Sequence, residues 1–552
     1  MMLNFMDKLG ELNPQFLREL KGRLKIRNVL LAISISLLGQ FILFMVFQAK
    51  LPSTLIELPF SHKYCTGKLE YGIADCILDN YDHVIMNWQL WYQDIFNLLS
   101  LMTIFVVLVG GTYLLINDLA TEERRDTLNF IRLSPQSPQS ILLGKILGVP
   151  ILLYILVLLA IPFHFWLGLN AKLPLNQIFV FYLILLAATF FYYSSALLFG
   201  LVGSWLNGFQ SWLGSTFMLG FLLFTEALLK HSITRNHPLL VFGLISPKYF
   251  IAHFSDSSTL ADFHGFGLPL GDSFALSIGF TLSIYFMGIY FIWQSLQRCY
   301  RDQNATMLSK QQSYLLTTSC AIITLGCANW HSEVKENFFI LLLLNSGLFL
   351  YLIAALTPNH QTLQDWARYQ HIYSVKHPGK RKLIKDLIWG EKSPSVLAIA
   401  INALIAITSI SVYISLSLAS SHGWDKISAF AALIFAFSLV LIYAALAQLL
   451  LFMKNEQRLL WTNGIVGAVI ILPPIVLFML FSDPSNQSFL WFFSIVAPSI
   501  FLFPPTNYSL NVMDAFLAIL GHAGILGLLL FQTKRQLQKA GVSATKALLA
   551  EN

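Results

Sequence analysis

The stretch IFNLLSLMTIFVVLVGGTYLLI, Ile95 to Ile116, has 22 residues and contains no Asp, Glu, Lys or Arg. A helix needs about 20 apolar residues to cross the hydrocarbon core of a bilayer. Similar runs recur along the chain, which is 56% hydrophobic and only 11% charged, against about 25% charged in ordinary soluble domains. This composition excludes a soluble globular protein. It predicts an all-α polytopic membrane protein, because a helix satisfies its own backbone in lipid.

Windows of about 19 residues predict twelve spans, six in each half of the chain. They are Asn28–Phe47, Ile95–Ile116, Ile141–Leu167, Ile178–Gly203, Trp212–Leu229, Phe274–Trp293, Tyr314–Trp330, Phe338–Leu356, Val396–Ala419, Ile427–Met453, Trp461–Phe481 and Ala515–Phe531. A thirteenth apolar run, Phe489–Phe503, contains the prolines of APSIFLFPP, which disfavour one straight helix. We expect it to be a re-entrant or interfacial segment on the outer side.

The distribution of Lys and Arg indicates the orientation of these spans. Most of the 35 basic residues fall in alternate loops, including Lys8–Arg27, Arg124–Lys145 and Arg368–Lys392. Because basic loops are retained in the cytoplasm, we expect both termini there. Topology thus explains the net charge of +7, and we expect no nucleic-acid partner. The first apolar run is expected to be a retained span, because no cleavage site of small residues follows it.

Two pairs of similar segments suggest that the halves are related. SPQSILL, Ser137–Leu143, resembles SPSVLAI, Ser393–Ile399, at an offset of 256 positions. FGLISPKYF, Phe242–Phe250, resembles FSIVAPSIF, Phe493–Phe501, at an offset of 251. Apolar sequence also produces short matches by its limited composition. If the repeat is real, six spans per half give two parallel halves related by an axis along the membrane normal.

These patterns divide the chain into five parts. They are an amphipathic N-terminal helix (1–27), a first six-span half (28–296), a cytoplasmic linker (297–313), a second six-span half (314–531) and a cytoplasmic tail (532–552).

The amphipathic part is the stretch NPQFLRELKGRLKIRN. Asn13 and Pro14 open it as cap and first helical residue. An apolar stripe (Phe16, Leu17, Leu20 and Leu24) runs beside four basic residues (Arg18, Lys21, Arg23 and Lys25). We expect this helix to lie on the cytoplasmic surface.

No catalytic motif is present in the sequence. It has no phosphate-binding G-x-x-x-x-G-K-[ST], no H-E-x-x-H and no G-x-S-x-G. We therefore predict a protein that is not an enzyme and has no catalytic residue or cofactor of its own; any ATP it uses would be hydrolysed by another chain. The few ionisable groups within spans are Glu226, which can pair with Lys230, and His164 and His522. We assign them packing or interfacial roles, and an ion-coupled carrier is disfavoured.

Five cysteines occur, without a C-x-x-C pair or a histidine cluster, so no metal site is predicted. Cys65 and Cys76 share one polar outer loop. A disulfide between them and two free thiols fit that loop about equally well.

Charge is densest in TEERRDTLNFIRLSPQSPQSILLGKIL, Thr121–Leu147. Asp118 or Thr121 can cap a helix here, and Pro135 and Pro138 would end it. Leu128, Phe130 and Ile131 are expected to form an apolar patch, which charged residues (Arg124, Arg125, Asp126 and Arg132) surround.

This stretch resembles the segment between the second and third spans of type-2 ATP-binding-cassette (ABC) exporter permeases. Those segments commonly contain acidic and basic residues, Gly-Thr, a small-residue–Pro step and I-L-x-G-K; here Asp126 stands in place of the Gly. The N-terminal helix and the SPKYF region also resemble family features. The resemblance implies a bacterial plasma-membrane permease, with two six-span halves fused in one chain and driven by a separate ABC ATPase, present in two copies.

The resemblance further implies that a coupling helix contacts the ATPase. Its residues would be Glu122, Glu123, Arg124, Arg125, Asp126, Thr127, Leu128, Phe130, Ile131 and Arg132. The second half, in IKDLIWGEKSPSVLAIAI, offers Lys385, Asp386, Trp389, Glu391 and Lys392 as weaker candidates. The substrate does not follow from the sequence. The alternative from another class is a membrane scaffold or assembly factor that binds a cytoplasmic partner without ATP coupling.

Overall fold

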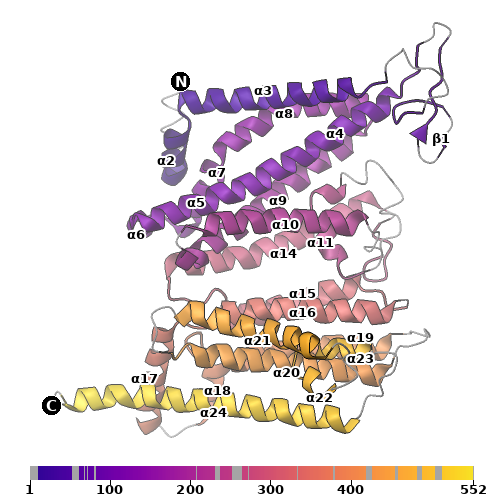
Figure 1. Cartoon of the computed structure of the whole chain (residues 1–552). Helices are drawn as coiled ribbons and strands as arrows, with labels where there is room; N and C mark the ends of the chain where they lie inside the picture. Colours follow the sequence, from indigo (N-terminus) through magenta and orange to yellow (C-terminus); the bar gives the residue numbers. More distant parts are fainter. Residues whose placement is uncertain are drawn as a thin grey trace. The chain divides into compact units, whose positions relative to one another are not determined.

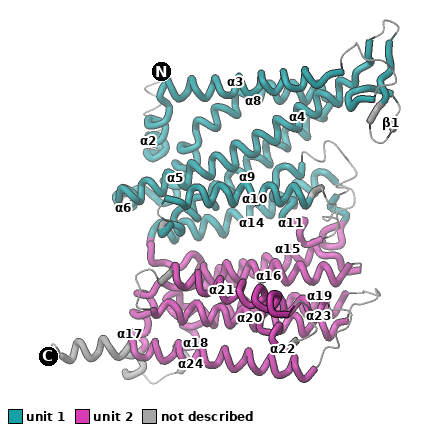
Figure 2. Tube along the Cα trace, in the orientation of Figure 1, with its two compact units in different colours: residues 1–235, 242–263, 269–301 teal, residues 236–241, 264–268, 302–552 magenta. Residues whose placement is uncertain are grey.

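The computed structural model describes most of the chain. The described residues are 10–52, 61–67, 69–70, 73–79, 83–206, 208–230, 237–250, 264–271, 273–331, 333–376, 380–417, 425–453, 458–481, 488–503 and 512–550. They form two compact units (Figure 2). Unit 1 comprises residues 1–235, 242–263 and 269–301, and unit 2 comprises 236–241, 264–268 and 302–552. The main division, at Arg301 and Asp302, falls inside the segment predicted as a linker.

Unit 1 is a bundle of long helices (Figure 1). Its helices are α2 (Pro14–Arg23), α3 (Ile26–Ala49), α4 (Trp88–Phe105), the π-helical turn η1 (Val106–Gly110), α5 (Gly111–Arg124), α6 (Thr127–Arg132), α7 (Pro138–Gly148), α8 (Ile151–Asn170), α9 (Leu175–Val202), the 3-10 turn η2 (Gly203–Leu206), α10 (Gln210–Lys230), the last three residues of α11 (Leu240–Leu244) and α14 (Phe274–Arg301). A short antiparallel ladder, β1 (Leu69–Glu70) with β2 (Ile73–Ala74), lies in the loop after α3.

Unit 2 is also helical. It contains α15 (Lys310–Cys327), α16 (Val334–Leu356), α17 (His360–Lys376), α18 (Lys380–Trp389), α19 (Val396–Leu416), α20 (Lys426–Leu450), α21 (Arg458–Leu480), α22 (Ser488–Trp491), α23 (Ala497–Leu502) and α24 (Val512–Ala550). Its core includes Phe349, Tyr413, Phe435 and Trp491, all fully buried. The helix α24 continues through most of the segment that was predicted as a tail.

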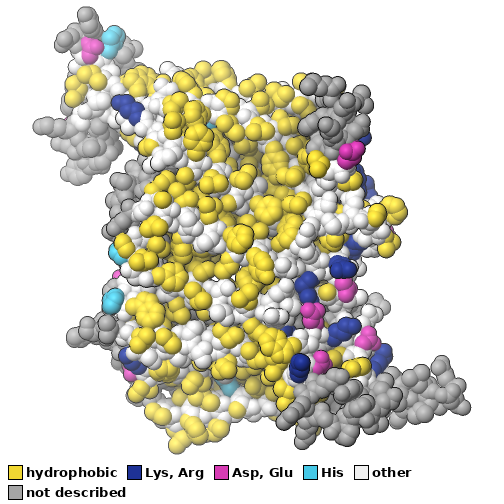
Figure 3. All heavy atoms as spheres, turned by 180° about the vertical axis from the view of Figure 1, so that it is seen from behind, with side chains coloured by type: hydrophobic (Ala, Val, Ile, Leu, Met, Phe, Trp, Pro, Cys, Tyr) yellow, Lys and Arg dark blue, Asp and Glu magenta, His cyan; other side chains and the backbone are white. Residues whose placement is uncertain are grey.

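Eleven helices among the described residues are long and apolar enough to span a membrane. The remaining predicted span, Tyr314–Trp330, coincides with α15, whose Ser313, Thr317 and Thr324 make it less apolar. Large apolar side chains on α3, α21 and α24 are exposed, as lipid-facing residues are. On the face shown in Figure 3, hydrophobic side chains cover the middle of unit 1. The prediction of an all-α polytopic membrane protein of about twelve helices is confirmed.

Three helix pairings recur in the two units. In unit 1, α3 packs on α8, α5 on α9, and α9 on α14. Numbered as spans, these are the first with the third, the second with the fourth, and the fourth with the sixth. In unit 2 the same positions pair, as α15 with α19, α16 with α20, and α20 with α24. Other pairings differ, since the fifth span packs mainly on α5 in unit 1 and on α20 in unit 2, so the repeat stays a prediction.

The second predicted span lies within one helical segment, Trp88–Arg124, which contains the π turn η1. A π turn leaves a carbonyl without its usual helical partner. The hydroxyl of Tyr193 donates to the carbonyl of Val107 over 2.8 Å. Gly111 permits this approach, since a Cβ there would lie 1.9 Å from the Tyr193 hydroxyl oxygen.

The third predicted span, Ile141–Leu167, is not one helix. It breaks between α7 and α8 at Val149 and Pro150, because proline has no N–H to continue the helical ladder. The hydroxyl of Tyr154 donates to the carbonyl of Ile146 over 2.9 Å and satisfies one acceptor near the break. As a result α7 is a separate helix, which carries Lys145.

Candidate functional site

The charged segment after the second span forms two helices rather than one. α5 continues to Arg124, and α6 begins only at Thr127. Asp118 and Thr121 therefore lie inside α5, and the prediction that either caps the charged helix is wrong. Between the helices Asp126 has φ 54°, a left-handed conformation that Gly adopts freely and Asp adopts more readily than most residues. The backbone there turns as it would at the glycine that the resemblance expects.

The apolar residues of α6 do not form the single patch that the sequence predicts. Leu128 and Ile131 are buried against unit 1, whereas Phe130 is 79% exposed and Leu133 is 86% exposed. The patch prediction was therefore wrong for Leu128 and Ile131, which pack inward because α6 lies against the bundle. Arg132 is half-buried, with its guanidinium 5.5 Å from the ring centre of Tyr300. The exposed surface of α6 and its flanks consists of Arg124, Arg125, Asp126, Thr127, Asn129, Phe130 and Leu133.

Glu122 does not belong to that exposed surface. It is buried at the end of α5, and its carboxylate contacts Lys145 at 2.7 Å and Arg18 at 2.6 Å. Its assignment as a residue that touches a partner is therefore wrong. Its charge is neutralised within the protein, because α2 and α7 bring two cations against the end of α5.

Glu122 is one of six residues that we call the ion cluster: Arg18, Glu19, Arg23, Asp118, Glu122 and Lys145. Lys145 is completely buried and contacts Asp118 at 2.6 Å. Arg23 contacts Asp118 at 2.6 Å and Glu19 at 3.2 Å. Three cations thus face three carboxylates. The pairing compensates for burying charge, which would otherwise cost several kcal/mol per ion.

The surroundings shift the pKa values of Glu19 on α2 and Lys145 on α7. Burial alone would lower the pKa of Lys145, but Asp118, Glu122 and Glu19 together raise it above its ordinary value. Burial and the charge of Asp118 raise the pKa of Glu19, against the opposing effects of Lys145 and Arg23. Lys145 therefore remains charged at neutral pH and holds the carboxylates around it.

Carboxylate oxygens of Glu19, Asp118 and Glu122 lie within 4.8 Å of one another, a spacing that suits a metal ion. The amine of Lys145 already contacts two of them. It supplies the positive charge that a metal ion would bring, so we assign the cluster a structural role.

Two glycines let α2 lie directly on α7. A Cβ on Gly144 would lie 2.9 Å from the Asn13 side-chain oxygen, and a Cβ on Gly148 would lie 2.5 Å from Cβ of Glu19. Asn13 caps α2 through the backbone N–H of Phe16 and also donates to the carbonyl of Ser140 over 2.7 Å. The predicted cap is confirmed. The deeply buried residues of α2 include polar Gln15 and Glu19 as well as Leu20, because α2 also faces the ion cluster.

The candidate partner-binding residues of the second half differ in their exposure. Lys385, Trp389, Glu391 and Lys392 are exposed around the end of α18. Asp386 is half-buried, and its carboxylate accepts hydrogen bonds from Trp366 and Gln370 on α17. Asp386 thus holds α17 against α18, a role that the sequence did not reveal.

Sequence reasoning also missed Lys310 at the start of α15. Its buried amine donates to the carbonyl of Leu387 over 2.6 Å, to the Ser393 hydroxyl over 2.7 Å and to the carbonyl of Pro394 over 3.1 Å. The repeated Ser-Pro step has different roles in the two units. Ser137 caps α7, whereas Ser393 binds Lys310. A lone lysine beside an apolar run was the available signal, for Lys310 as for Lys145.

The ionisable residues of the spans have local partners. His164 lies 2.6 Å from the Ser100 hydroxyl and 2.8 Å from that of Tyr182. His522 lies 2.8 Å from the Ser438 hydroxyl. Glu226 contacts Lys248 at 2.7 Å, while the side chain of Lys230, its predicted partner, lies outside the described residues. These contacts agree with packing and interfacial roles.

At the other end of unit 1, Cys65 and Cys76 form a disulfide, with Cα atoms 4.8 Å apart. The bond closes the polar loop between α3 and α4, so the structure selects the disulfide over two free thiols. Together with the apolar helices, these features define an integral membrane protein of the α-helical class. No family model, curated protein or solved structure matches the chain.

Proposed function

We propose that this chain is the permease of an ABC exporter, with two six-span halves and no ATPase site of its own. A separate ABC ATPase would contact α6 from the cytoplasm and drive the spans. The observation that carries the proposal is the combination of an exposed apolar tip on α6 with a rigid base beneath it.

The tip consists of Phe130 and Leu133, both at least 79% exposed. It differs from the lipid-facing surface because exposed Arg124, Arg125 and Asp126 precede it closely in the chain. Aromatic side chains next to arginine are common at the centres of protein interfaces. A helix tip of this kind suits a groove on a soluble partner.

The base is the ion cluster. The hydroxyl of Thr127 at the start of α6 donates to the carbonyl of Glu122 over 3.1 Å, and the carboxylate of Glu122 contacts α2 and α7 through Arg18 and Lys145. A force on α6 would therefore reach α5, which is continuous with the second span, and α7, which precedes the third. A coupling helix requires this kind of connection.

The test co-expresses the tagged chain with each ABC ATPase encoded in its own genome and measures copurification and ATP hydrolysis. We expect one ATPase to copurify with the wild-type chain, and Phe130→Asp to reduce its recovery at least tenfold. The matched control is Leu12→Asp, which changes another exposed leucine, 80% exposed, in the segment before α2. Copurification that is unaffected by Phe130→Asp in a folded protein would exclude α6 as the contact.

A membrane scaffold remains the second candidate, and one observation favours it. In unit 2 the candidate Asp386 is engaged between α17 and α18 rather than offered to a partner, although Trp389 on the same helix is 53% exposed. A scaffold needs one docking helix, whereas two ATPase copies need two. A partner that binds α6 but hydrolyses no ATP would support the scaffold.

A further inference from the structure

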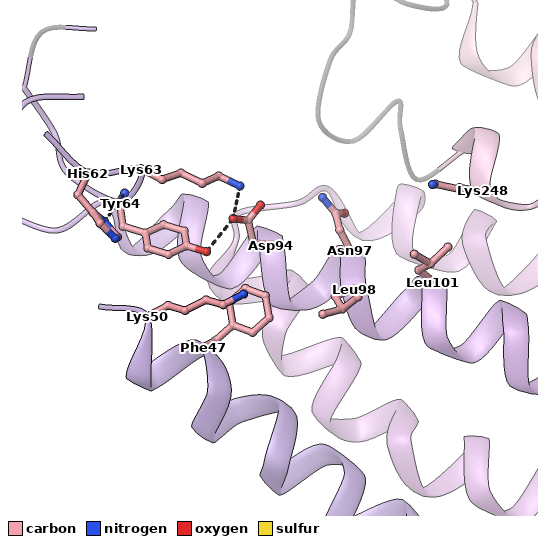
Figure 4. Close-up of a pocket in the computed structure, with 10 residues that line it drawn as sticks. All are labelled: Phe47, Lys50, His62, Lys63, Tyr64, Asp94, Asn97, Leu98, Leu101 and Lys248. Atoms are coloured by element: carbon pink, nitrogen blue, oxygen red, sulfur yellow. Dashed lines mark hydrogen bonds and ion pairs between the residues drawn. The ribbon is translucent and has the colours of Figure 1, made fainter. Parts of the chain in front are cut away.

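A preformed pocket of about 740 Å³ opens in unit 1 near the disulfide-bonded loop. It lies at the end of the unit opposite α6, where α3 ends and α4 begins (Figures 1 and 4). Its lining comes from α3, α4, the loop between them and the segment after α11. None of these residues belongs to the ion cluster or to α6, so the pocket is independent of the proposed ATPase contact.

Three lysine amines line the pocket: Lys50 after α3, Lys63 in the loop and Lys248 after α11. Lys63 contacts Asp94 at 2.6 Å, and Lys248 contacts Glu226 at 2.7 Å. Lys50 lies 4.9 Å from the ring centre of Phe47, and no carboxylate of the described residues lies within ion-pair distance of its amine. Among the described residues, three amines against two carboxylates leave the pocket with an excess of positive charge.

The pocket also has an apolar wall. Phe47 closes it from α3, and Leu98 and Leu101 line it from α4. Leu98 and Leu101 are one helical turn apart, within the spanning segment that begins at Trp88. Figure 4 shows Lys50 and Lys63 at one end of the pocket, and Lys248 at the other end, near Leu101 of α4. Charge and apolar surface are thus adjacent at the edge of the membrane-spanning region.

The basic end is held in a fixed arrangement. The buried Tyr64 donates its hydroxyl hydrogen to Asp94 over 2.9 Å, beside the contact between Asp94 and Lys63 (Figure 4). The carbonyl of Tyr64 accepts from the backbone N–H of Asn87 over 2.8 Å. Its neighbour Cys65 is bonded to Cys76. Because the loop is tied down at these points, the pocket needs little ordering before a ligand binds.

From these features we infer that the pocket binds one anionic phospholipid, with its phosphate against Lys50 and an acyl chain along Leu98 and Leu101. Basic residues at the membrane boundary attract anionic headgroups, and charge-assisted hydrogen bonds from lysine to phosphate are stronger than neutral ones. The apolar wall adds to the affinity by burying part of the acyl chain. Lys63 stays with Asp94 and shapes the edge of the pocket.

The experiment uses the purified full-length chain in detergent. Phosphatidylglycerol and phosphatidylcholine with identical acyl chains are added stepwise, and native mass spectrometry measures the affinity of the first bound lipid. We expect phosphatidylglycerol to bind at least tenfold more tightly. Lys50→Gln should remove at least tenfold of that affinity, and Lys50→Arg should retain it. The matched control is Lys172→Gln, which removes an exposed lysine from the α8–α9 turn at the same end of unit 1.

Three outcomes would overturn the inference. The first is equal affinity for the two lipids in the wild-type chain. The second is an equal effect of Lys50→Gln and Lys172→Gln when circular dichroism shows both variants folded. The third is equally tight binding of sn-glycerol 3-phosphate, because a soluble anion would then suffice without an acyl chain.

Discussion

The amine of Lys145 lies 2.6 Å from a carboxylate oxygen of Asp118, in the contact between α7 and α5. Lys145 is completely buried, so its charge has no water to stabilise it. The pair is part of the ion cluster that joins α2, α5 and α7. Its removal should affect how these helices are held together.

Lys145→Met leaves Asp118 and Glu122 without their buried counter-ion. We expect a loss of about 3–5 kcal/mol in unfolding free energy at pH 7.5, as for other broken buried pairs. Lys145 is one of the cations that lower the pKa of Glu19, so without it that carboxyl pKa, already raised by burial and by Asp118, should rise further. A raised carboxyl pKa gives stability that is present at low pH and lost as pH rises through it, so the variant should recover stability between pH 7.5 and 5.5.

Thermal unfolding of the purified protein measures this effect. Lys172→Met is the control, because Lys172 is exposed, and it should cost little at either pH. An equal deficit of Lys145→Met at both pH values would contradict the role of the buried charge.

Gly148→Ala should loosen α2 from α7. The new Cβ would lie 2.5 Å from Cβ of Glu19, a distance that requires the helices to separate. We expect faster trypsin cleavage within α2, at Lys21 or Arg23. Gly39→Ala is the matched control, because its Cβ would meet no atom within 4 Å. Equal cleavage rates in the two variants would contradict the role of Gly148 in holding α2 close to α7.

Lys310→Met should destabilise unit 2. It removes three hydrogen bonds and leaves the buried Ser393 hydroxyl and nearby carbonyls without this donor. Unsatisfied buried polar groups cost about 1–3 kcal/mol each. A lower unfolding temperature is expected, together with easier proteolysis of α17 and α18. Lys385→Met, at an exposed position on α18, should change neither measurement.

The disulfide predicts a pattern of thiol labelling. Cys65 and Cys76 should react with a maleimide only after reduction, since their sulfurs are bonded to each other. Cys299, Cys320 and Cys327 are free thiols and should react after unfolding without a reductant. Mass spectrometry of labelled peptides distinguishes the two groups. Labelling of Cys65 in unfolded, unreduced protein from intact cells would show that the bond does not form there.

Several features could be predicted because they depend on neighbouring residues. The apolar runs identify the spanning helices, since a helix satisfies its backbone within one segment. Asn13 and Pro14 identify the start of α2, because a cap needs only the next three residues. The candidate region around α6 was found in the same way, from local charge density. The predicted spans differ from the helices mainly where backbone breaks occur, as at Pro150.

The roles of individual charges were not predictable in this way. Glu122 was assigned to an exposed helix face, but it pairs with Arg18, 104 positions away. Asp118 was considered as a cap, but it binds Arg23, 95 positions away. Contacts of this kind depend on how α2 lies against α7, which no local pattern specifies.

The sequence by itself determined that this is an α-helical membrane protein, because hydropathy and helix capping are properties of single segments. Only the tertiary structure decided which charges are buried. It pairs Lys145 with Asp118 and Glu122, turns Leu128 and Ile131 inward, and leaves Phe130 at the surface. The physical reason is that a buried charge needs a partner in space, and folding brings those partners together from distant parts of the chain.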